Sequence, residues 1–252
     1  MSPIARRIEG FRWIDNHIFE TEGVRFYIDD VYGDTATDLP SIVVAKTRDF
    51  FEDYARELGD APTRKVLEFG IWKGGSALAL ASLFDVERLV AVDICEPVEA
   101  FDAIRASTAL GRRVAPYYRT SQDDAPAISR ILAEEFAGEP VDLIIDDASH
   151  DYALTKATFE HAFRHLRRGG WYAIEDWAWA HHRGWPWPKE KPALTNLVLR
   201  LNIVTVCRPD LFDRVVVRPN AVFLQKGPEA TMDEVLDIDA CIELDGRTLG
   251  LF

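Results

Sequence analysis

The sequence has few cysteines, no long apolar run and no excess of basic charge. Its cysteines, Cys95, Cys207 and Cys241, are odd in number and widely spaced. They fit neither a disulfide framework nor a CxxC metal site, and they indicate a reducing compartment. No apolar run approaches membrane-spanning length, and the first residues do not resemble a signal peptide. We therefore expect a cytoplasmic protein that does not bind membranes.

Acidic side chains outnumber basic ones, 42 to 29, which gives a formal net charge of -13. Such a charge opposes binding to a polyanion, and no basic stripe with interleaved aromatics is present, so nucleic acid is not an expected partner. The chain has 252 residues, of which 48% are hydrophobic. This length and composition favour a single large core.

Residues 64–176 alternate predicted strands and helices with short turns between them, which is typical of a parallel sheet covered by helices on both faces. The predicted strands are 65–69, 89–93, 114–118, 141–146 and 171–176. The predicted helices are 77–84, 97–110, 125–136 and 153–166, the last stopped by the Arg-Arg-Gly-Gly of residues 167–170. Residues 215–225 predict an antiparallel hairpin at the sheet edge, so the expected fold class is doubly wound, mostly parallel α/β.

The flanking regions have weaker patterns. Residues 1–60 carry aromatics without a clear period, and we expect a helical or irregular extension that serves as a lid or as a contact in a homo-oligomer. The tryptophan-rich stretch 177–188 is too long for a tight turn, and a helix is plausible over 192–202. Residues 229–245 hold seven acids and no base, which indicates a solvated face or tail, and we expect an acidic C-terminal tail over 229–252.

Two predicted strands end in paired carboxylates. One ends at Asp146 and Asp147, with His150 shortly after, and the other ends at Glu175 and Asp176. If the two strands are neighbours, four acids and a histidine gather at one end of the sheet. Because unpaired like charges are costly at a partly dry site, this cluster predicts a bound cation. Hard oxygen ligands of this kind suit Mg²⁺.

A glycine-rich turn follows the predicted strand 65–69 and has the sequence Glu-Phe-Gly-Ile-Trp-Lys-Gly-Gly-Ser over residues 68–76. Its amides can approach a ligand at a helix N-terminus, and Asp93, at the end of the next strand, can accept hydrogen bonds from ribose hydroxyls. Trp72 stands where the dinucleotide fingerprint requires a second glycine, and Glu68 would repel a pyrophosphate but tolerate a cationic cofactor. S-adenosylmethionine is therefore favoured over NAD. A plain packing turn with a helix-capping Asp93 is the alternative.

Taken together, the glycine turn, Asp93, the segment Asp-Asp-Ala-Ser-His and the segment Glu-Asp-Trp resemble class I S-adenosylmethionine-dependent methyltransferases. More narrowly, they are similar to the metal-dependent macrocin and mycinamicin sugar O-methyltransferases and to cephalosporin-hydroxylase-like proteins. The likeness covers roughly residues 60–180. It implies a Rossmann-like, seven-stranded sheet in a methyltransferase domain over 61–228.

The resemblance also implies roles for individual residues. It makes Asp147, Glu175 and Asp176 the Mg²⁺ ligands and His150 the general base. The residues expected to contact S-adenosylmethionine lie in the glycine turn, at strand ends and in the loop after 114–118. They are Glu68, Gly70, Lys73, Gly74, Gly75, Ser76, Asp93, Gln122, Asp123 and Asp146.

The expected activity is Mg²⁺-dependent methyl transfer to a hydroxyl of a small natural product with vicinal oxygens, such as a sugar or a catechol-like ring, in secondary metabolism such as antibiotic biosynthesis. Two alternative functions are a nicotinamide oxidoreductase, disfavoured by Trp72 and Lys73, and a non-catalytic cofactor-binding subunit.

Structural alternatives remain for the individual residues as well. His150 and Asp151 could cap the next helix, Glu175 and Asp176 could pair with Arg167 or Arg168, and a helix cap near Pro126 could explain Asp123.

Overall fold

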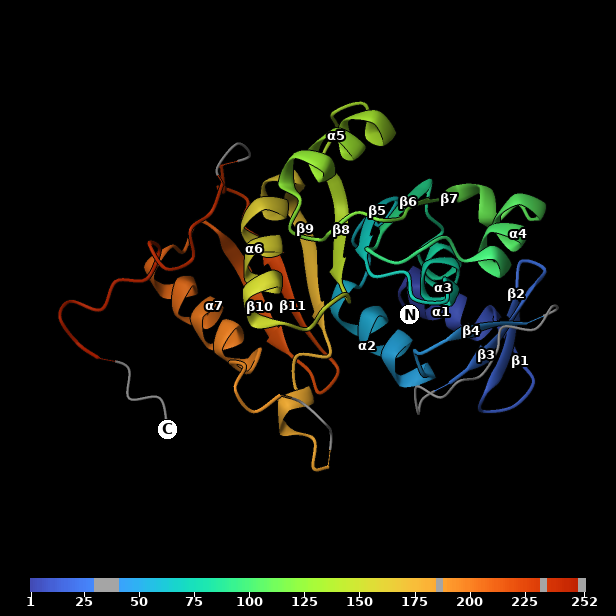
Figure 1. Cartoon of the computed structure of the whole chain (residues 1–252), viewed down its shortest axis with the longest axis horizontal. Helices are drawn as coiled ribbons and strands as arrows, with labels where there is room; N and C mark the ends of the chain where they lie inside the picture. The colour runs from blue at the N-terminus through green and yellow to red at the C-terminus, as the bar shows by residue number, and fades with distance from the viewer. Residues whose placement is uncertain (30–40, 185–187, 232–234, 249–252) are drawn as a thin grey trace.

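A seven-stranded sheet in the order β10-β11-β9-β8-β5-β6-β7 forms the centre of the molecule (Figure 1). The computed structural model describes residues 1–29, 41–184, 188–231 and 235–248. The strands are β5 Lys65–Phe69, β6 Arg88–Val92, β7 Val114–Tyr117, β8 Val141–Asp146, β9 Leu166–Glu175, β10 Phe212–Val217 and β11 Ala221–Lys226. The first five of these run parallel to one another, and the antiparallel hairpin of β10 and β11 closes the edge, with β11 antiparallel to β9. The predicted mostly parallel sheet is confirmed.

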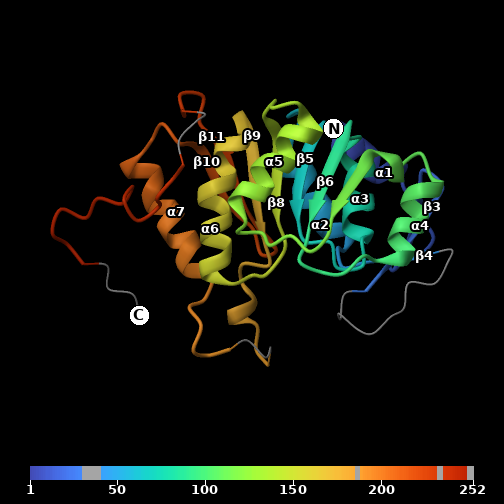
Figure 2. The same cartoon turned by 45° about the horizontal axis from the view of Figure 1, so that its top comes forward.

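Helices cover both faces of this sheet (Figure 2). They are α1 Pro3–Gly10, α2 Arg48–Leu58, α3 Gly75–Phe84, α4 Glu99–Ser107, α5 Ala125–Phe136, α6 Tyr152–Ala162 and α7 Thr195–Cys207. Because side chains alternate along a strand, Leu143 and Ile145 face the apolar cluster that contains α1 to α4, whereas Ile144 faces the cluster of α5 to α7. The fold is therefore doubly wound. No helix in the described ranges is long and apolar enough to cross a membrane.

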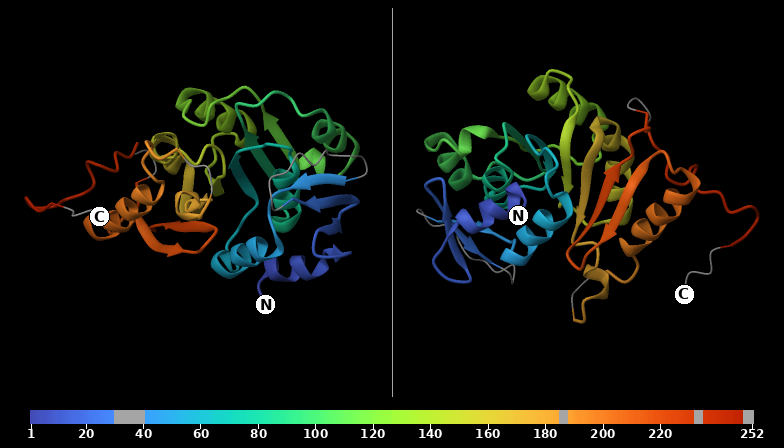
Figure 3. Two further views of the ribbon diagram at one scale, coloured as in Figure 1. Left: turned by 60° about the horizontal axis from the view of Figure 1, so that its bottom comes forward. Right: turned by 180° about the vertical axis from the view of Figure 1, so that it is seen from behind.

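The N-terminal region differs from the expected helical or irregular layer. Besides α1 and α2 it contains a second, four-stranded sheet in the order β1-β2-β3-β4 (Figure 3). Its strands are β1 Arg12–Trp13, β2 Ile18–Thr21, β3 Val24–Ile28 and β4 Ser41–Val44. Phe19 and Phe26 are fully buried and stack with ring centroids 4.7 Å apart, in the same apolar cluster as Val66 of β5. The extension thus shares a core with the large sheet.

The junction between α6 and β9 also differs from the prediction. The helix ends at Ala162, a short 3-10 turn follows at Phe163–His165, and β9 already begins at Leu166. Residues 167–170 therefore lie in a strand and do not stop a helix. Gly169 adopts φ +69°, and the pairing register between β8 and β9 shifts in this region. This glycine therefore permits an irregularity of the bulge type near the start of β9.

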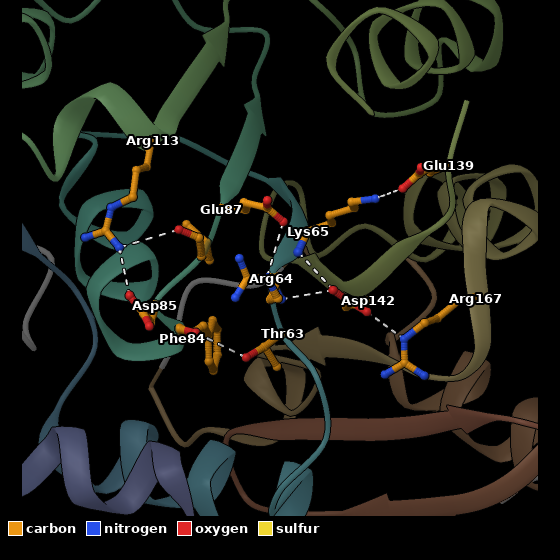
Figure 4. A network of polar contacts seen from close by, with 11 residues as sticks. Thr63, Arg64, Lys65, Phe84, Asp85, Glu87, Arg113, Glu139, Asp142 and Arg167 are labelled. Carbon is orange, nitrogen blue, oxygen red and sulfur yellow. Dashed lines mark hydrogen bonds and ion pairs between the residues drawn. The ribbon is translucent and has the colours of Figure 1, made fainter. Parts of the chain in front are cut away.

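Asp142 of β8 joins three strands at the amino edge of the sheet (Figure 4). Its carboxylate accepts hydrogen bonds from the backbone N–H of Arg64 at 2.9 Å and of Lys65 at 3.0 Å, and from Nε of Arg167 at 2.6 Å. Arg168 donates to the carbonyl of Ala230 at 2.9 Å. Both arginines that could have neutralised Glu175 and Asp176 are thus engaged at this edge, away from the paired acids at the carboxyl ends of the strands.

The acidic C-terminal segment is anchored to the domain in its described part. Leu236 and Ile238 are buried in the apolar cluster of α5 to α7. Asp239 forms ion pairs with Lys156 of α6 and Arg200 of α7. These residues therefore pack against the helices, while the described acids of the segment remain exposed, as expected for a solvated face.

Candidate active site

A pocket of about 320 Å³ lies at the carboxyl edge of the sheet, where β5, β8 and β9 end. Residues of the loop after β4, the glycine turn and the loops after β8 and β9 line it. Six of the predicted site residues belong to this lining, namely Gly70, Ser76, Asp147, His150, Glu175 and Asp176. The ends of β8 and β9 therefore meet at one cavity, as expected because the two strands are parallel neighbours in the sheet.

Asp147, His150 and Asp176 converge in this pocket. One potential ligand atom of each lies within 4.8 Å of the others, and His150 Nε2 is 4.0 Å from Asp176 Oδ2. His150 and Asp176 both adopt positive φ, at 52° and 51°, a conformation that non-glycine residues rarely adopt and that is often retained at functional sites. Two carboxylates and an imidazole form a donor set that can hold a divalent metal.

Glu175 is placed differently from the other acids. Its carboxylate accepts hydrogen bonds from Lys46 Nζ and from the hydroxyl of Tyr54, the latter at 2.5 Å. Lys46 Nζ also donates to Asp147 Oδ2 at 2.6 Å, and the Lys46 side chain is only 3% exposed. The Glu175 carboxylate is thus directed at Lys46 and Tyr54, and it connects to the group of Asp147, His150 and Asp176 through the lysine.

The charges around Lys46 do not balance. Burial raises the pKa of Glu175 well above its usual value, and the attraction of Lys46 offsets only part of this rise. Burial lowers the pKa of Lys46, but attraction to Asp147, Glu175 and Glu68 outweighs it and holds that pKa well above the usual value. The lysine therefore stays charged among three carboxyl groups. This surplus of acids can accommodate a second cation, which would favour the ionised forms of the carboxyl groups whose pKa burial raises.

Glu68 is fully buried at the end of β5. One of its oxygens accepts a hydrogen bond from the Ser76 hydroxyl, whereas Oε2 has no hydrogen-bond partner among the described residues. Burial raises the pKa of Glu68 to about 8, although Lys46 and Ser76 lower it in part. A buried carboxylate oxygen without a hydrogen-bond partner costs free energy. Oε2 is therefore suited to accept a hydrogen bond from a ligand, for example from an ammonium group.

The glycine turn is held close to the strand ends. Gly70 adopts φ +107°, and a Cβ there would lie 2.2 Å from the Asp147 carbonyl oxygen, so only glycine permits this approach. Asp93 Oδ2 accepts hydrogen bonds from the backbone N–H groups of Ile71 at 2.6 Å and Trp72 at 3.1 Å. Asp93 therefore fixes the turn from the end of β6, in addition to any contact with a ligand.

The remaining glycines of the turn face protein atoms. A Cβ on Gly74 would lie 2.2 Å from the Phe101 ring, and one on Gly75 would lie 1.9 Å from the Val43 carbonyl oxygen. Packing of α4 and β4 against α3 thus accounts for both glycines without a cofactor. Lys73 Nζ lies 4.6 Å from the centroid of the neighbouring Trp72 ring.

Gln122 and Asp146 connect the loops after β7 and β8. The Gln122 side chain donates to Thr158 Oγ1 at 2.8 Å and to Asp146 Oδ1 at 3.3 Å, and accepts from the Ser149 backbone N–H at 3.1 Å. Burial raises the pKa of Asp146 to about 7. These two side chains are therefore part of the framework that holds the Asp147 loop.

Asp123 is exposed in the loop after β7 and does not cap α5. The neighbouring Asp124 is the cap, because its Oδ1 accepts from the Ala127 backbone N–H at 3.0 Å. Asp123 instead accepts a hydrogen bond from the Ser121 hydroxyl. Capping thus does not explain Asp123.

Sequence analysis missed Lys46 and Tyr54, which come from the N-terminal region. Lys46 follows the apolar run of β4, and a lysine at the end of a buried strand was the available signal. Tyr54 lies on the buried face of α2 and carries no comparable signal. In the tryptophan-rich stretch, the Trp179 ring packs on His150 with centroids 4.2 Å apart, while Trp185 and Trp187 lie outside the described residues.

Comparison with protein families locates the same part of the chain. Residues 67–177 match the family model described as "Methyltransferase domain". Residues 67–177 are therefore similar to a methyltransferase domain. All predicted site residues, from Glu68 to Asp176, lie within this matched region, whereas Lys46 and Tyr54 precede it.

Curated relatives resemble about half of the chain in sequence. The chain is 36% identical over 127 residues to L-olivosyl-oleandolide 3-O-methyltransferase of Streptomyces antibioticus, covering 50% of this chain and 31% of that protein. It is 33% identical over 129 residues to Mycinamicin VI 2''-O-methyltransferase of Micromonospora griseorubida, covering 48% of this chain and 28% of that protein. The match therefore spans less than a third of either relative's length.

A solved structure supports the fold. It is described as the MycE methyltransferase from the mycinamycin biosynthetic pathway in complex with Mg and SAH. The TM-score is 0.55 at 25% sequence identity, and the alignment covers 72% of this chain and 49% of that chain. The predicted Rossmann-like fold is confirmed.

Proposed function

We propose that the chain is an Mg²⁺-dependent O-methyltransferase that moves a methyl group from S-adenosylmethionine to a hydroxyl of a small natural product. One observation carries the proposal: Asp147, His150 and Asp176 converge on a pocket that also borders the glycine turn. A group that accepts a proton and groups that can hold a cation are thus next to the expected cofactor site.

The residues at the end of β5 fit the cofactor. S-adenosylmethionine supplies an activated methyl group on a positively charged sulfur and also carries an amino group. Glu68 Oε2 can accept a hydrogen bond from that amino group, and the surplus of acids around Lys46 favours a cation over the pyrophosphate of NAD. Asp93 and Asp123 are proposed to contact the ribose and the adenine, respectively.

Asp147 and Asp176, together with Glu175, are the proposed Mg²⁺ ligands. The ion supplies charge that lowers the pKa of a substrate hydroxyl. His150 then accepts the hydroxyl proton as general base, and packing against Trp179 holds its ring in place. Glu175 has to exchange Lys46 for the metal in order to act as a ligand.

We further propose that the acceptor hydroxyl belongs to a sugar. The names of the two relatives and of the MycE structure connect those proteins to glycosylated natural products or their biosynthesis. Phe50, Trp72 and Trp179 give the pocket aromatic walls, which suit the apolar faces of a sugar ring. Vicinal hydroxyls would orient one oxygen for transfer.

Calorimetry with S-adenosylmethionine and with NADH tests the cofactor, and methyl transfer to a panel of glycosylated antibiotics, with Mg²⁺ or with EDTA, tests the reaction. We expect binding of S-adenosylmethionine and Mg²⁺-stimulated transfer. Tight binding of NADH alone would exclude the methyltransferase, and cofactor binding without transfer to any acceptor would favour a non-catalytic subunit.

Asp147→Ala separates the metal from the cofactor. We expect loss of Mg²⁺-stimulated transfer with nearly unchanged affinity for S-adenosylmethionine. The matched control is Asp213→Ala, which removes an exposed carboxylate from the edge strand β10 and leaves transfer intact. Full metal-independent activity of Asp147→Ala would refute the ligand assignment.

A further inference from the structure

Lys46 lies between two of the carboxylates proposed to bind metal. Its Nζ donates to Asp147 Oδ2 at 2.6 Å and also contacts Glu175 Oε2. A side-chain ammonium thus bridges an acid of the β8 loop and an acid at the end of β9. A divalent ion bound by both acids would have to take over these same two oxygens.

The surroundings hold the lysine firmly in this position. Lys46 is 3% exposed and Glu175 is 1% exposed, so water does not screen their pairing. The Phe50 ring lies 5.1 Å from Nζ, and Tyr54 donates to the second oxygen of Glu175. Removing one partner from a buried pair of this kind leaves an uncompensated charge, which is strongly destabilising.

We propose that Lys46 is a built-in cation that competes with the divalent metal for Asp147 and Glu175, and thereby sets the metal affinity of the site. This inference rests on the proposed function, because it assumes that these acids bind the metal. While Lys46 occupies both oxygens, only the fraction of molecules in which it has withdrawn is competent to bind. The apparent dissociation constant is the intrinsic constant divided by that fraction.

The competition connects metal binding to the wall of the pocket. Lys46 lies between β4 and α2, and its neighbours Ala45 and Phe50 line the same cavity as His150. Withdrawal of the lysine would therefore take place at the wall of this cavity. This makes Lys46 a positioning residue, since it acts through Asp147 and Glu175.

Isothermal titration with Mg²⁺ alone, and with Mn²⁺ alone, on the full chain tests the inference. We expect Lys46→Met to bind the metal about tenfold more tightly than wild type, because no cation has to be displaced. Lys46→Arg, which keeps the charge, should bind like wild type or more weakly. A purely structural role would predict the opposite order, with the neutral variant binding more weakly.

The matched control is Lys65→Met, the same substitution at the amino end of β5, far from the pocket. Lys65 pairs there with Glu139. This control should leave metal affinity at the wild-type value, and an equal gain in it would overturn the inference by attributing the effect to overall charge. Lys46→Gln is a second neutral variant that can still donate hydrogen bonds if the methionine variant does not fold.

Thermal denaturation with and without Mg²⁺ provides a second measurement, and the metal should raise the Tm of the neutral variants more than that of wild type. Metal binding by wild type with no gain in either neutral variant overturns the competition but leaves the proposed function standing. Absence of metal binding in every variant overturns the metal site and the competition together. Wild type that neither binds S-adenosylmethionine nor transfers methyl overturns the proposed function, whatever the metal titrations show.

Discussion

Carboxylates on the β8–β9 side of the sheet edge face an open pocket, whereas Asp93 on the β6 side is held by the backbone of its own chain. Asp147 and Asp176 line the cavity with His150. Asp93 accepts hydrogen bonds from three backbone N–H groups, those of Ile71, Trp72 and Cys95. The same residue type thus lines a cavity on one side and anchors a turn on the other.

The difference shows where the molecule accepts an electrostatic cost. Acids that only stabilise structure are satisfied, as Asp142 is by Arg64, Lys65 and Arg167. Around Lys46, three carboxyl groups surround the lysine and burial keeps the pKa of Glu68 near 8. Such imbalance is tolerated where a ligand can relieve it.

The largest effect should come from the open side. We expect His150→Ala to lower kcat by about 10²–10⁴-fold, because the proton of the acceptor hydroxyl loses its base. Affinity for S-adenosylmethionine should change little. Steady-state kinetics and calorimetry measure the two effects, with His17→Ala, which changes an exposed histidine in the turn between β1 and β2, as control. An unaltered kcat would remove His150 as base.

A second test uses Glu68, which ends β5 at the border between the two sides. Burial raises the pKa of Glu68 from the ordinary 4.5 to about 8, so between these pH values the folded chain holds a proton that the unfolded chain has lost. The free energy of unfolding of wild type should therefore fall as pH rises through this window, and the loss should be complete above it.

Glu68→Gln mimics the protonated acid and should not show this decline. In the ligand-free protein, the variant should gain up to about 5 kcal/mol relative to wild type between low and high pH. Urea denaturation at a series of pH values measures the difference. Parallel pH profiles for the two proteins would contradict the assigned pKa.

On the β6 side, Asp93→Ala tests the turn anchor. Three backbone N–H groups lose their acceptor, and we expect the free energy of unfolding to fall by about 1–3 kcal/mol, with weaker cofactor binding. Urea denaturation and calorimetry measure both effects. Glu96→Ala, three residues further on and exposed, removes a surface ion pair with Arg119 and should leave the midpoint nearly unchanged. Equal losses in the two variants would argue against the anchor.

The smallest effect should come from Asp123. Because the side chain is exposed and does not cap α5, Asp123→Ala should change stability by less than about 0.5 kcal/mol. Affinity for S-adenosylmethionine should still fall several-fold if the carboxylate contacts the adenine. Asp124→Ala is the matched variant. It should lower the stability because α5 loses its cap, and it should leave the affinity for S-adenosylmethionine unchanged. Unchanged affinity for S-adenosylmethionine in Asp123→Ala would show that Asp123 does not contact the cofactor, and the proposed contacts would be limited to the ends of β5 and β6.

The paired acids could be predicted because long apolar runs mark β8 and β9, and the carboxyl ends of parallel neighbours meet at one edge. The N-terminal sheet could not, since its strands are two to five residues long and show no clear period. Lys46 and Tyr54 reach the pocket only through the packing of that region. The close approach of Gly75 to the backbone of β4 could not be predicted either, because local spacing cannot distinguish a ligand from the backbone of another strand.

The contact between Gly75 and Val43 has a consequence for engineering. The carbonyl of Val43 occupies the space of any side chain at position 75. A chimaera that takes residues before 60 from a relative would carry its own backbone path into this contact. Such a chimaera should therefore fold only when the donor segment leaves room for the host helix at Gly75, or when the exchange is extended so that Val43 and Gly75 come from the same parent.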